Sequence, residues 1–131
     1  MPVVYSHRVR YHETDQQRFL FNAHYLMIAD IALTEYYRMI GCPYPDVVDR
    51  GFDPSVVKAE ISFQRPTYFD DILDVDVTCT RVGTSSFDFR FTMTRGDATV
   101  AVIEMVYVNV DIAAEKSTPI PADVAAALRG A

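Results

Sequence analysis

Residues 9–40 read VRYHETDQQRFLFNAHYLMIADIALTEYYRMI, and this stretch decides the fold. Residues 23–40 contain neither Gly nor Pro, which predicts one long helix. Asn22 is a favourable N-cap, Gly41 stands where a left-handed residue ends many helices, and Pro43 prevents continuation. Few polar residues interrupt the segment, so we expect a helix that is mostly buried.

The chain before this helix has the alternation of a strand. Apolar Val3, Tyr5, Val9 and Tyr11 share one parity, which predicts a strand with one buried face that ends near His12. The following residues, ETDQQRFLFN, break the period and form a loop.

The second half of the chain predicts antiparallel strands. Apolar residues alternate with polar ones over residues 57–63, 73–79 and 87–93, and residues 100–110 are apolar on both parities, as in a central strand. We expect a short second helix near Pro45 and a terminal helix beginning near Pro121. The order is one strand, one long helix and four strands, which is an α+β layout with the helix on one face of an antiparallel five-stranded sheet.

Length and composition limit the possible classes. The chain has 131 residues, 50% of them hydrophobic and 23% charged, which fits a single domain over residues 1–131. No apolar run reaches the roughly 20 residues of a membrane span, and the first residues do not resemble a signal peptide. The formal net charge of -6 argues against a nucleic-acid partner.

The two cysteines and the sheet edges support further expectations. Cys42 and Cys79 lie in dissimilar settings, and we expect free thiols in the cytoplasm. Five strands and one helix leave exposed edges and an incompletely covered face, so we expect a homodimer or homotetramer.

Several polar residues of the first strand, the loop after it and the long helix have simple structural interpretations. On spacing alone, Asp15 reads as a turn residue that bonds its own backbone. His7, His12 and Glu13 alternate between the faces of a strand and do not form a convincing metal site, so we expect no metal and no cofactor. Glu35 and Arg38 are three residues apart on the helix and predict an ion pair.

Three blocks of the sequence resemble one known family. RVRYHETDQQRFLFNAHYL, SFQRPTYFDDILDVDV and PIPADV occur in the order found in the 4-hydroxybenzoyl-CoA thioesterase branch of hotdog-fold proteins. The resemblance implies a hotdog fold, in which the sheet wraps around the central helix, and active sites between subunits at the start of that helix. Many bacterial members have a glycine pair after the aspartate and a histidine at the helix start, where this chain has Gln16-Gln17 and Asn22.

The resemblance also implies an activity and a set of site residues. Asp15 matches the catalytic aspartate, and the backbone N–H of Asn22 matches the amide that polarises the thioester carbonyl. The expected function is hydrolysis of a small, medium or aromatic acyl-CoA; the alternatives are an acyl-carrier-protein thioesterase and a non-catalytic acyl-CoA-binding protein. The expected substrate-binding residues are Phe19, Phe21, His24, Tyr25, Arg65 and Arg81.

Overall fold

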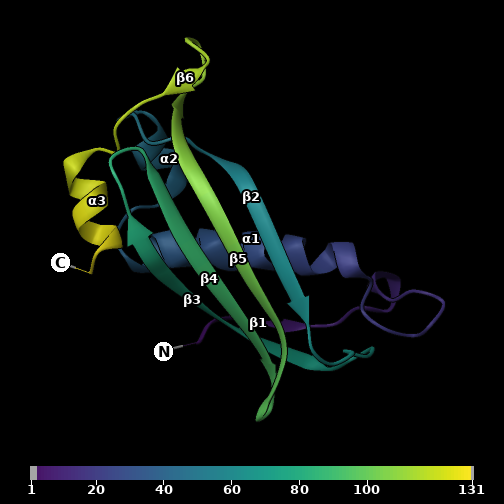
Figure 1. Ribbon diagram of the computed structural model, residues 1–131. Helices are drawn as coiled ribbons and strands as arrows, with labels where there is room; N and C mark the ends of the chain where they lie inside the picture. The colour runs from purple at the N-terminus through teal and green to yellow at the C-terminus, as the bar shows by residue number, and fades with distance from the viewer. Residues whose placement is uncertain (1–2, 131) are drawn as a thin grey trace.

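The computed structural model describes residues 3–130, in which one curled antiparallel sheet packs against one long helix (Figure 1). The strands are β1 (Val3–Arg8), β2 (Pro54–Phe63), β3 (Ile72–Val82), β4 (Ser86–Arg95), β5 (Ala98–Asp111) and the two-residue β6 (Lys116–Ser117). The helices are α1 (Asn22–Met39), α2 (Tyr44–Val48), α3 (Ala122–Leu128) and a 3₁₀ helix over Tyr11–Glu13.

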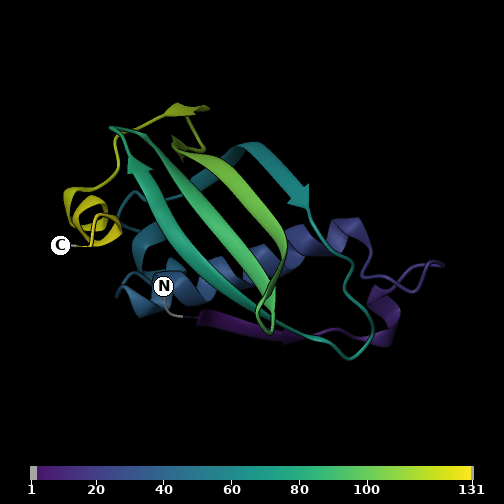
Figure 2. The same cartoon turned by 60° about the horizontal axis from the view of Figure 1, so that its bottom comes forward.

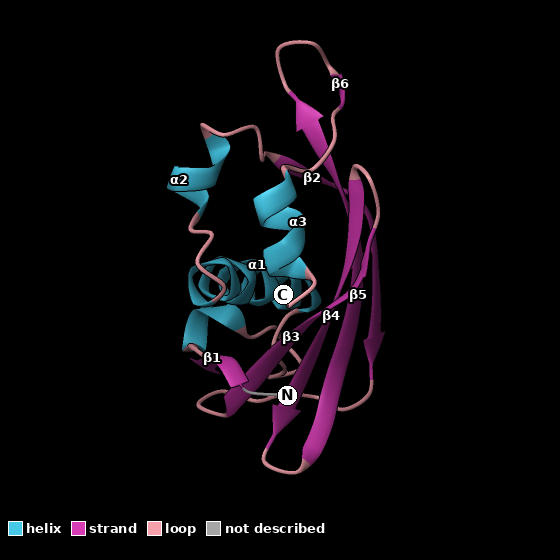
Figure 3. Ribbon diagram, turned by 90° about the vertical axis from the view of Figure 1, so that its left-hand side faces the viewer, coloured by secondary structure: helices cyan, strands magenta, loops and turns pink. Residues whose placement is uncertain are grey.

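The strand order is β1-β3-β4-β5-β2, with β6 paired to the end of β5. Seen from its edge, the sheet forms one layer and the helices lie together on its concave side (Figure 3). After a rotation that brings the lower edge forward, α1 is seen to run beneath the sheet (Figure 2). The predicted hotdog arrangement of the α+β class is confirmed.

The core between sheet and helix is strongly aromatic. Phe87, Phe89 and Phe91 on β4 are at most 1% exposed, as their alternation with polar residues predicts. Phe89 packs edge-on against Tyr36 of α1, with ring centroids 5.3 Å apart. Burying one such side chain stabilises the fold by roughly 2–3 kcal/mol, so these rings help to attach α1 to the sheet.

Helix α1 is buried on one side and exposed on the other. The buried residues are Tyr25, Ile28, Ala29, Ala32, Leu33, Tyr36 and Tyr37. On the remaining surface Leu26, Met27 and Ile31 are between 37% and 58% exposed, so the expectation of a mostly buried helix holds for only one face of a single chain. The helix ends as predicted, with Gly41 at a φ of +78°.

The start of α1 differs from the prediction by one residue. Phe21 is the N-cap, with the extended backbone angles φ -65° and ψ 140°, and its N–H donates to the carbonyl of Glu13 at 2.9 Å. Asn22 is therefore the first helical residue, and the prediction that its side chain caps the helix is wrong. This backbone bond fixes the chain direction at Phe21 without help from a polar side chain.

The first strand is shorter than predicted. β1 ends at Arg8, and the chain then curls into the 3₁₀ helix, because the carboxylate of Glu13 accepts the backbone N–H of Arg10 at 2.7 Å. Tyr11, which the alternation places in the core, is 80% exposed for this reason.

Strand β2 is a free edge of the sheet, and most of its side chains are exposed on both faces. Val56, Val57 and Phe63 are 50%, 59% and 53% exposed. A long apolar edge strand is unusual in a monomer, because its unpaired backbone groups invite another chain. Among residues 3–130, no helix is long and apolar enough to cross a membrane.

Candidate active site

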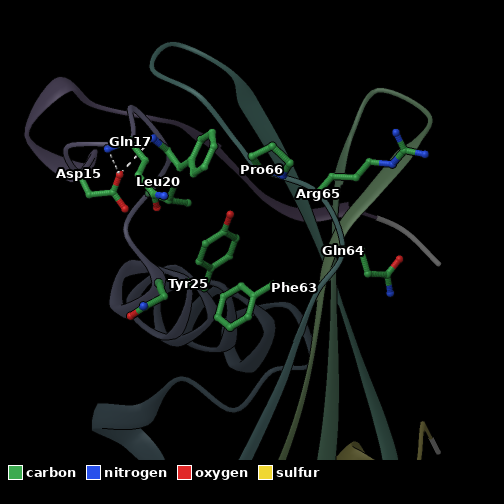
Figure 4. Close-up of a pocket in the computed structure, with 10 residues that line it drawn as sticks. Asp15, Gln17, Leu20, Tyr25, Phe63, Gln64, Arg65 and Pro66 are labelled. Carbon is green, nitrogen blue, oxygen red and sulfur yellow. Dashed lines mark hydrogen bonds between the residues drawn. The ribbon is translucent and has the colours of Figure 1, made fainter.

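A cavity of about 460 Å³ lies where three segments of the chain meet, at one end of α1 (Figure 4). The segments are the loop after the 3₁₀ helix, the first turn of α1 and the end of β2 with the residues that follow it. The lining residues are Asp15, Gln17, Phe19, Leu20, Asn22, Tyr25, Phe63, Gln64, Arg65 and Pro66. The predicted site residues Asp15, Phe19, Asn22, Tyr25 and Arg65 are thus brought together.

The loop holds Asp15 in a tight turn. One carboxylate oxygen, Oδ1, accepts the backbone N–H of Gln17 at 2.8 Å and that of Phe19 at 3.3 Å. The backbone closes the same turn, since Asp15 N–H donates to the carbonyl of Phe19 at 2.9 Å. Oδ2 has no hydrogen-bond partner among residues 3–130. The aspartate therefore fulfils its predicted turn role with one oxygen, and the other forms no hydrogen bond within the described residues.

Arg18 completes this turn in a conformation that suits glycine. Its N–H donates to the carbonyl of Asp15 at 2.9 Å, and its φ is +68°, in the left-handed region. A non-glycine residue there costs of order 1 kcal/mol or more. The left-handed backbone thus lies next to Gln16 and Gln17, the positions at which the resemblance predicts a glycine pair.

The first turn of α1 supplies unpaired backbone donors. Within the described part of the chain, the N–H groups of Asn22 and Ala23 have no hydrogen-bond partner, whereas that of His24 donates to Phe21. Such groups lie at the positive end of the helix dipole and stabilise negative charge on an oxygen. Asn22 is the first helical residue and lines the cavity, so this end of the helix borders the cavity.

Aromatic rings form the apolar wall of the cavity. Tyr25 and Phe63 pack edge-to-face with centroids 5.2 Å apart, and Figure 4 shows the two rings side by side. The phenol of Tyr25 donates to the hydroxyl of Thr67 at 3.2 Å, and burial raises the pKa of Tyr25. The bond to Thr67 holds the ring of Tyr25 in the cavity wall.

The arginines near and far from the cavity differ in their partners. Arg65 lines the cavity, extends away from Asp15 (Figure 4), and forms no ion pair among residues 3–130. Arg81 lies at the far end of β3, roughly 30 Å along the strand from the loop, and is bound in bidentate fashion by Asp88 at 3.0 and 2.9 Å. The structure does not bring Arg81 to the cavity of its own chain.

Two further predicted residues lie beside the cavity without lining it. Phe21 is 44% exposed, and its ring lies 6.1 Å from that of His24. In contrast, Phe63, Gln64 and Pro66 line the cavity and were not assigned to the site from the sequence. All three belong to the sequence block SFQRPTYF, in which only Arg65 was predicted to bind the substrate.

Known proteins resemble this chain over nearly its whole length. The family model of the thioesterase-like superfamily matches residues 9–128. A 1,4-dihydroxy-2-naphthoyl-CoA hydrolase from Synechococcus elongatus is 25% identical over 115 residues, which are 86% of this chain and 85% of that relative.

Solved structures agree with the match to the thioesterase-like superfamily. A crystal structure of an Aquifex aeolicus protein superposes with a TM-score of 0.89 at 26% identity, covering 97% of this chain and 99% of the other. A gentisyl-coenzyme A thioesterase shares the fold with a TM-score of 0.85 at 23% identity, over 96% of this chain and 99% of the other. The chain belongs to the thioesterase-like superfamily. It is a hotdog-fold thioester hydrolase, related to the 4-hydroxybenzoyl-CoA thioesterase branch.

Proposed function

We propose that this protein hydrolyses a small, medium or aromatic acyl-CoA, with Asp15 as the catalytic carboxylate and the N–H of Asn22 as the donor to the thioester oxygen. The observation that carries the proposal is the presence of both groups on one cavity. Among the residues that the structure describes, Oδ2 of Asp15 and the N–H groups at the start of α1 have no hydrogen-bond partner. Residues 1–131 are proposed to form one such domain.

The mechanism follows from the charges that develop at the thioester. The carbonyl oxygen accepts the N–H of Asn22, which stabilises the negative charge of the tetrahedral intermediate. Asp15 acts in one of two roles: Oδ2 attacks the carbonyl carbon, or it removes a proton from a water molecule that attacks. In both routes the C–S bond breaks and coenzyme A leaves as a thiolate, which is a good leaving group. Attack by Oδ2 gives an acyl–aspartate anhydride, which water then hydrolyses to the free acid and the carboxylate of Asp15. In the water route the free acid forms directly, and the proton held by Asp15 passes to the thiolate. The bonds to Oδ1 hold the carboxylate in place.

The cavity wall supports an acyl group with a flat or compact apolar body. Phe19, Tyr25 and Phe63 surround the space beside Asp15, and aromatic rings pack well against one another. The 1,4-dihydroxy-2-naphthoyl-CoA hydrolase of Synechococcus elongatus acts on an aromatic thioester by its name, which agrees with this wall. An aromatic acyl group is therefore the first to test.

Coenzyme A is the proposed carrier of the acyl group, and the cation at the cavity agrees with its phosphates. The pantetheine arm separates the phosphates of coenzyme A from the thioester, so a phosphate-binding cation belongs away from the catalytic carboxylate. Arg65 is placed in this way and forms no ion pair among the described residues. An arginine can form two hydrogen bonds with one phosphate.

The proposed oligomeric state is a homodimer or a homotetramer, and the tetramer would consist of two such dimers. The apolar edge of β2 and the exposed face of α1 with Leu26, Met27 and Ile31 would both be covered by a second copy of the chain. The cytoplasm is the proposed location, and the free thiols of Cys42 and Cys79 agree with a reducing compartment.

A substrate panel tests the proposed function. Thiol release is measured for aromatic, short and medium acyl-CoAs and for the same acyl groups on an acyl carrier protein. We expect kcat/KM to be highest for an aromatic acyl-CoA. A clear preference for the carrier would replace coenzyme A in the proposal, and binding of acyl-CoA without any thiol release would support the non-catalytic alternative.

A further inference from the structure

A buried acid–imidazole pair lies beneath the loop that carries Asp15. Nε2 of His7 lies 2.9 Å from Oε1 and 3.2 Å from Oε2 of Glu13, and the two side chains are 8% and 12% exposed. Nδ1 of His7 lies 3.1 Å from the hydroxyl of Tyr5. These two side chains, which the sequence offered as a weak metal site, bond to each other instead, and none of the described residues forms a metal-binding group of three.

The carboxylate of Glu13 determines which atom donates in this pair. A carboxylate can only accept, so Nε2 of His7 carries a hydrogen and donates it to Glu13. In the neutral imidazole Nδ1 is then the acceptor for the hydroxyl of Tyr5, and all polar groups of the three side chains are satisfied. Burial by itself raises the pKa of Glu13, but the hydrogen bonds from Arg10 N–H and His7 outweigh it and lower the pKa overall.

Glu13 connects this pair to both halves of the proposed site. Its carboxylate Oε1 accepts the N–H of Arg10 at 2.7 Å, and its carbonyl accepts the N–H of Phe21 at 2.9 Å. Phe21 is the N-cap of α1 and directly precedes Asn22. On the other side, Glu13 is two residues before Asp15. Glu13 thus closes the base of the loop, because it bonds both to Arg10, which follows β1, and to Phe21, the N-cap of α1.

The loop has further attachments beside Glu13. The N–H and the hydroxyl of Thr14 donate to the carbonyl of Tyr11 at 3.2 and 2.8 Å, and Phe19 forms an isolated bridge with Tyr68. Thr14 and Leu20 form an isolated bridge, and Leu20 N–H donates to the carbonyl of Thr67 at 2.7 Å. These contacts fix the outer part of the loop but not the distance of its base from β1. The imidazole of His7 on β1 is the side chain that holds the carboxylate of Glu13 there.

We propose that His7 and Glu13 are positioning residues. By closing the base of the catalytic loop, they fix the position of Asp15 relative to the N–H of Asn22. The proposal rests on the proposed function for its effect on turnover, and on the hydrogen bonds alone for its effect on loop order. Neither side chain lines the cavity, so both act through Asp15 and Asn22 rather than on the substrate.

Two substitutions that break the pair and one conservative substitution test the proposal. His7→Phe and Glu13→Ala each remove the pair, and we expect kcat to fall at least about tenfold with KM within about twofold, because misplaced groups lose transition-state contacts. The double variant is expected to lose no more than either single variant, since the two residues act as one unit. Glu13→Gln keeps an oxygen at the position of Oε1, which accepts both Arg10 and His7, and is expected to restore kcat to within about threefold of the wild type.

A matched control separates positioning from general loss of stability. Val124 is completely buried in α3, which lies at the end of the molecule opposite the catalytic loop (Figure 1). Val124→Ala destabilises the fold by roughly 1–2 kcal/mol without touching the loop, and its kcat is expected to stay near that of the wild type. Equal kcat values for His7→Phe, Glu13→Ala and Val124→Ala would overturn the proposal.

Amide hydrogen exchange gives a second measurement that does not need enzymatic activity. We expect exchange at the N–H groups of Phe21 and Asp15 to be at least about tenfold faster in His7→Phe and Glu13→Ala than in Val124→Ala. If the wild type cleaves no thioester, the proposed function fails, and exchange still decides the role of the pair. Unchanged exchange at Phe21 and Asp15 would show that His7 and Glu13 do not order the loop.

Discussion

At the scale of single residues, Arg65 is the side chain with the simplest test. It lines the cavity and forms no ion pair among residues 3–130, whereas Arg81 is held by Asp88 far from the loop. We expect Arg65→Gln to raise KM for acyl-CoA about fivefold, because a charged hydrogen bond to phosphate is lost, and to leave KM for the matching acyl-pantetheine unchanged.

Arg81→Gln is the matched control for this change. Its KM for acyl-CoA is expected to stay within about twofold of the wild type, in steady-state assays at the same ionic strength. An equal rise of KM for the acyl-pantetheine in Arg65→Gln would show that the residue acts on the arm or the acyl group and not on a phosphate.

Glu13 gives a prediction for pH. Its pKa is lowered in the folded protein, because hydrogen bonds to Arg10 and His7 outweigh the effect of burial. A lowered carboxyl pKa stabilises the fold at pH values above the unfolded pKa, and this stabilisation is lost as the pH falls through the folded pKa. We expect Glu13→Gln to have a lower Tm than the wild type near neutral pH, and this gap to shrink in acid. A gap that stays constant in a calorimetric series down to about pH 3 would contradict this.

At the scale of elements, a substitution at the start of α1 tests whether the backbone N–H of Asn22 binds the thioester oxygen. Proline is tolerated at the first helical position and removes only the N–H, and Phe21 already has the extended backbone that proline requires before it. We expect Asn22→Pro to fold with a Tm close to that of the wild type and to lose about 10²–10³-fold in kcat.

Asn22→Ala is the comparison, because it removes the side chain and keeps the N–H. We expect it to lose less than about threefold in kcat, since the side chain of Asn22 makes no capping bond. If Asn22→Ala were as inactive as Asn22→Pro, the side chain rather than the backbone would be the functional group.

The elements also show how far the sequence could predict this site. The aromatic face of β4 and the C-terminal end of α1 follow from local patterns, because alternation and a glycine past the helix end depend on near neighbours. The end of β1 does not, because alternation of apolar and polar residues does not show that the carboxylate of Glu13 turns back to the N–H of Arg10 and to the imidazole of His7. Phe63 was missed for a similar reason, since it meets Tyr25 only after the chain has folded.

At the scale of the whole molecule, the free edge of β2 predicts a homodimer. Val57 is 59% exposed on this edge, and a charge there would have to be buried between two copies of the chain. We expect Val57→Glu to weaken self-association at least about tenfold in analytical ultracentrifugation. Ile112→Glu changes a side chain that is 65% exposed beyond β5, and is expected to leave association unchanged. A Val57→Glu protein that associates as tightly as the wild type would exclude this edge as the interface.

The most direct test of the central claim is the turnover of Asp15→Asn. The amide oxygen of asparagine can still accept the N–H groups of Gln17 and Phe19, so the turn is expected to keep its shape while the charge of the carboxylate is lost. With the best acyl-CoA of the panel, we predict that kcat falls at least about 10²-fold while KM stays within a few fold. A kcat equal to that of the wild type would contradict the assignment of Asp15 as the catalytic carboxylate.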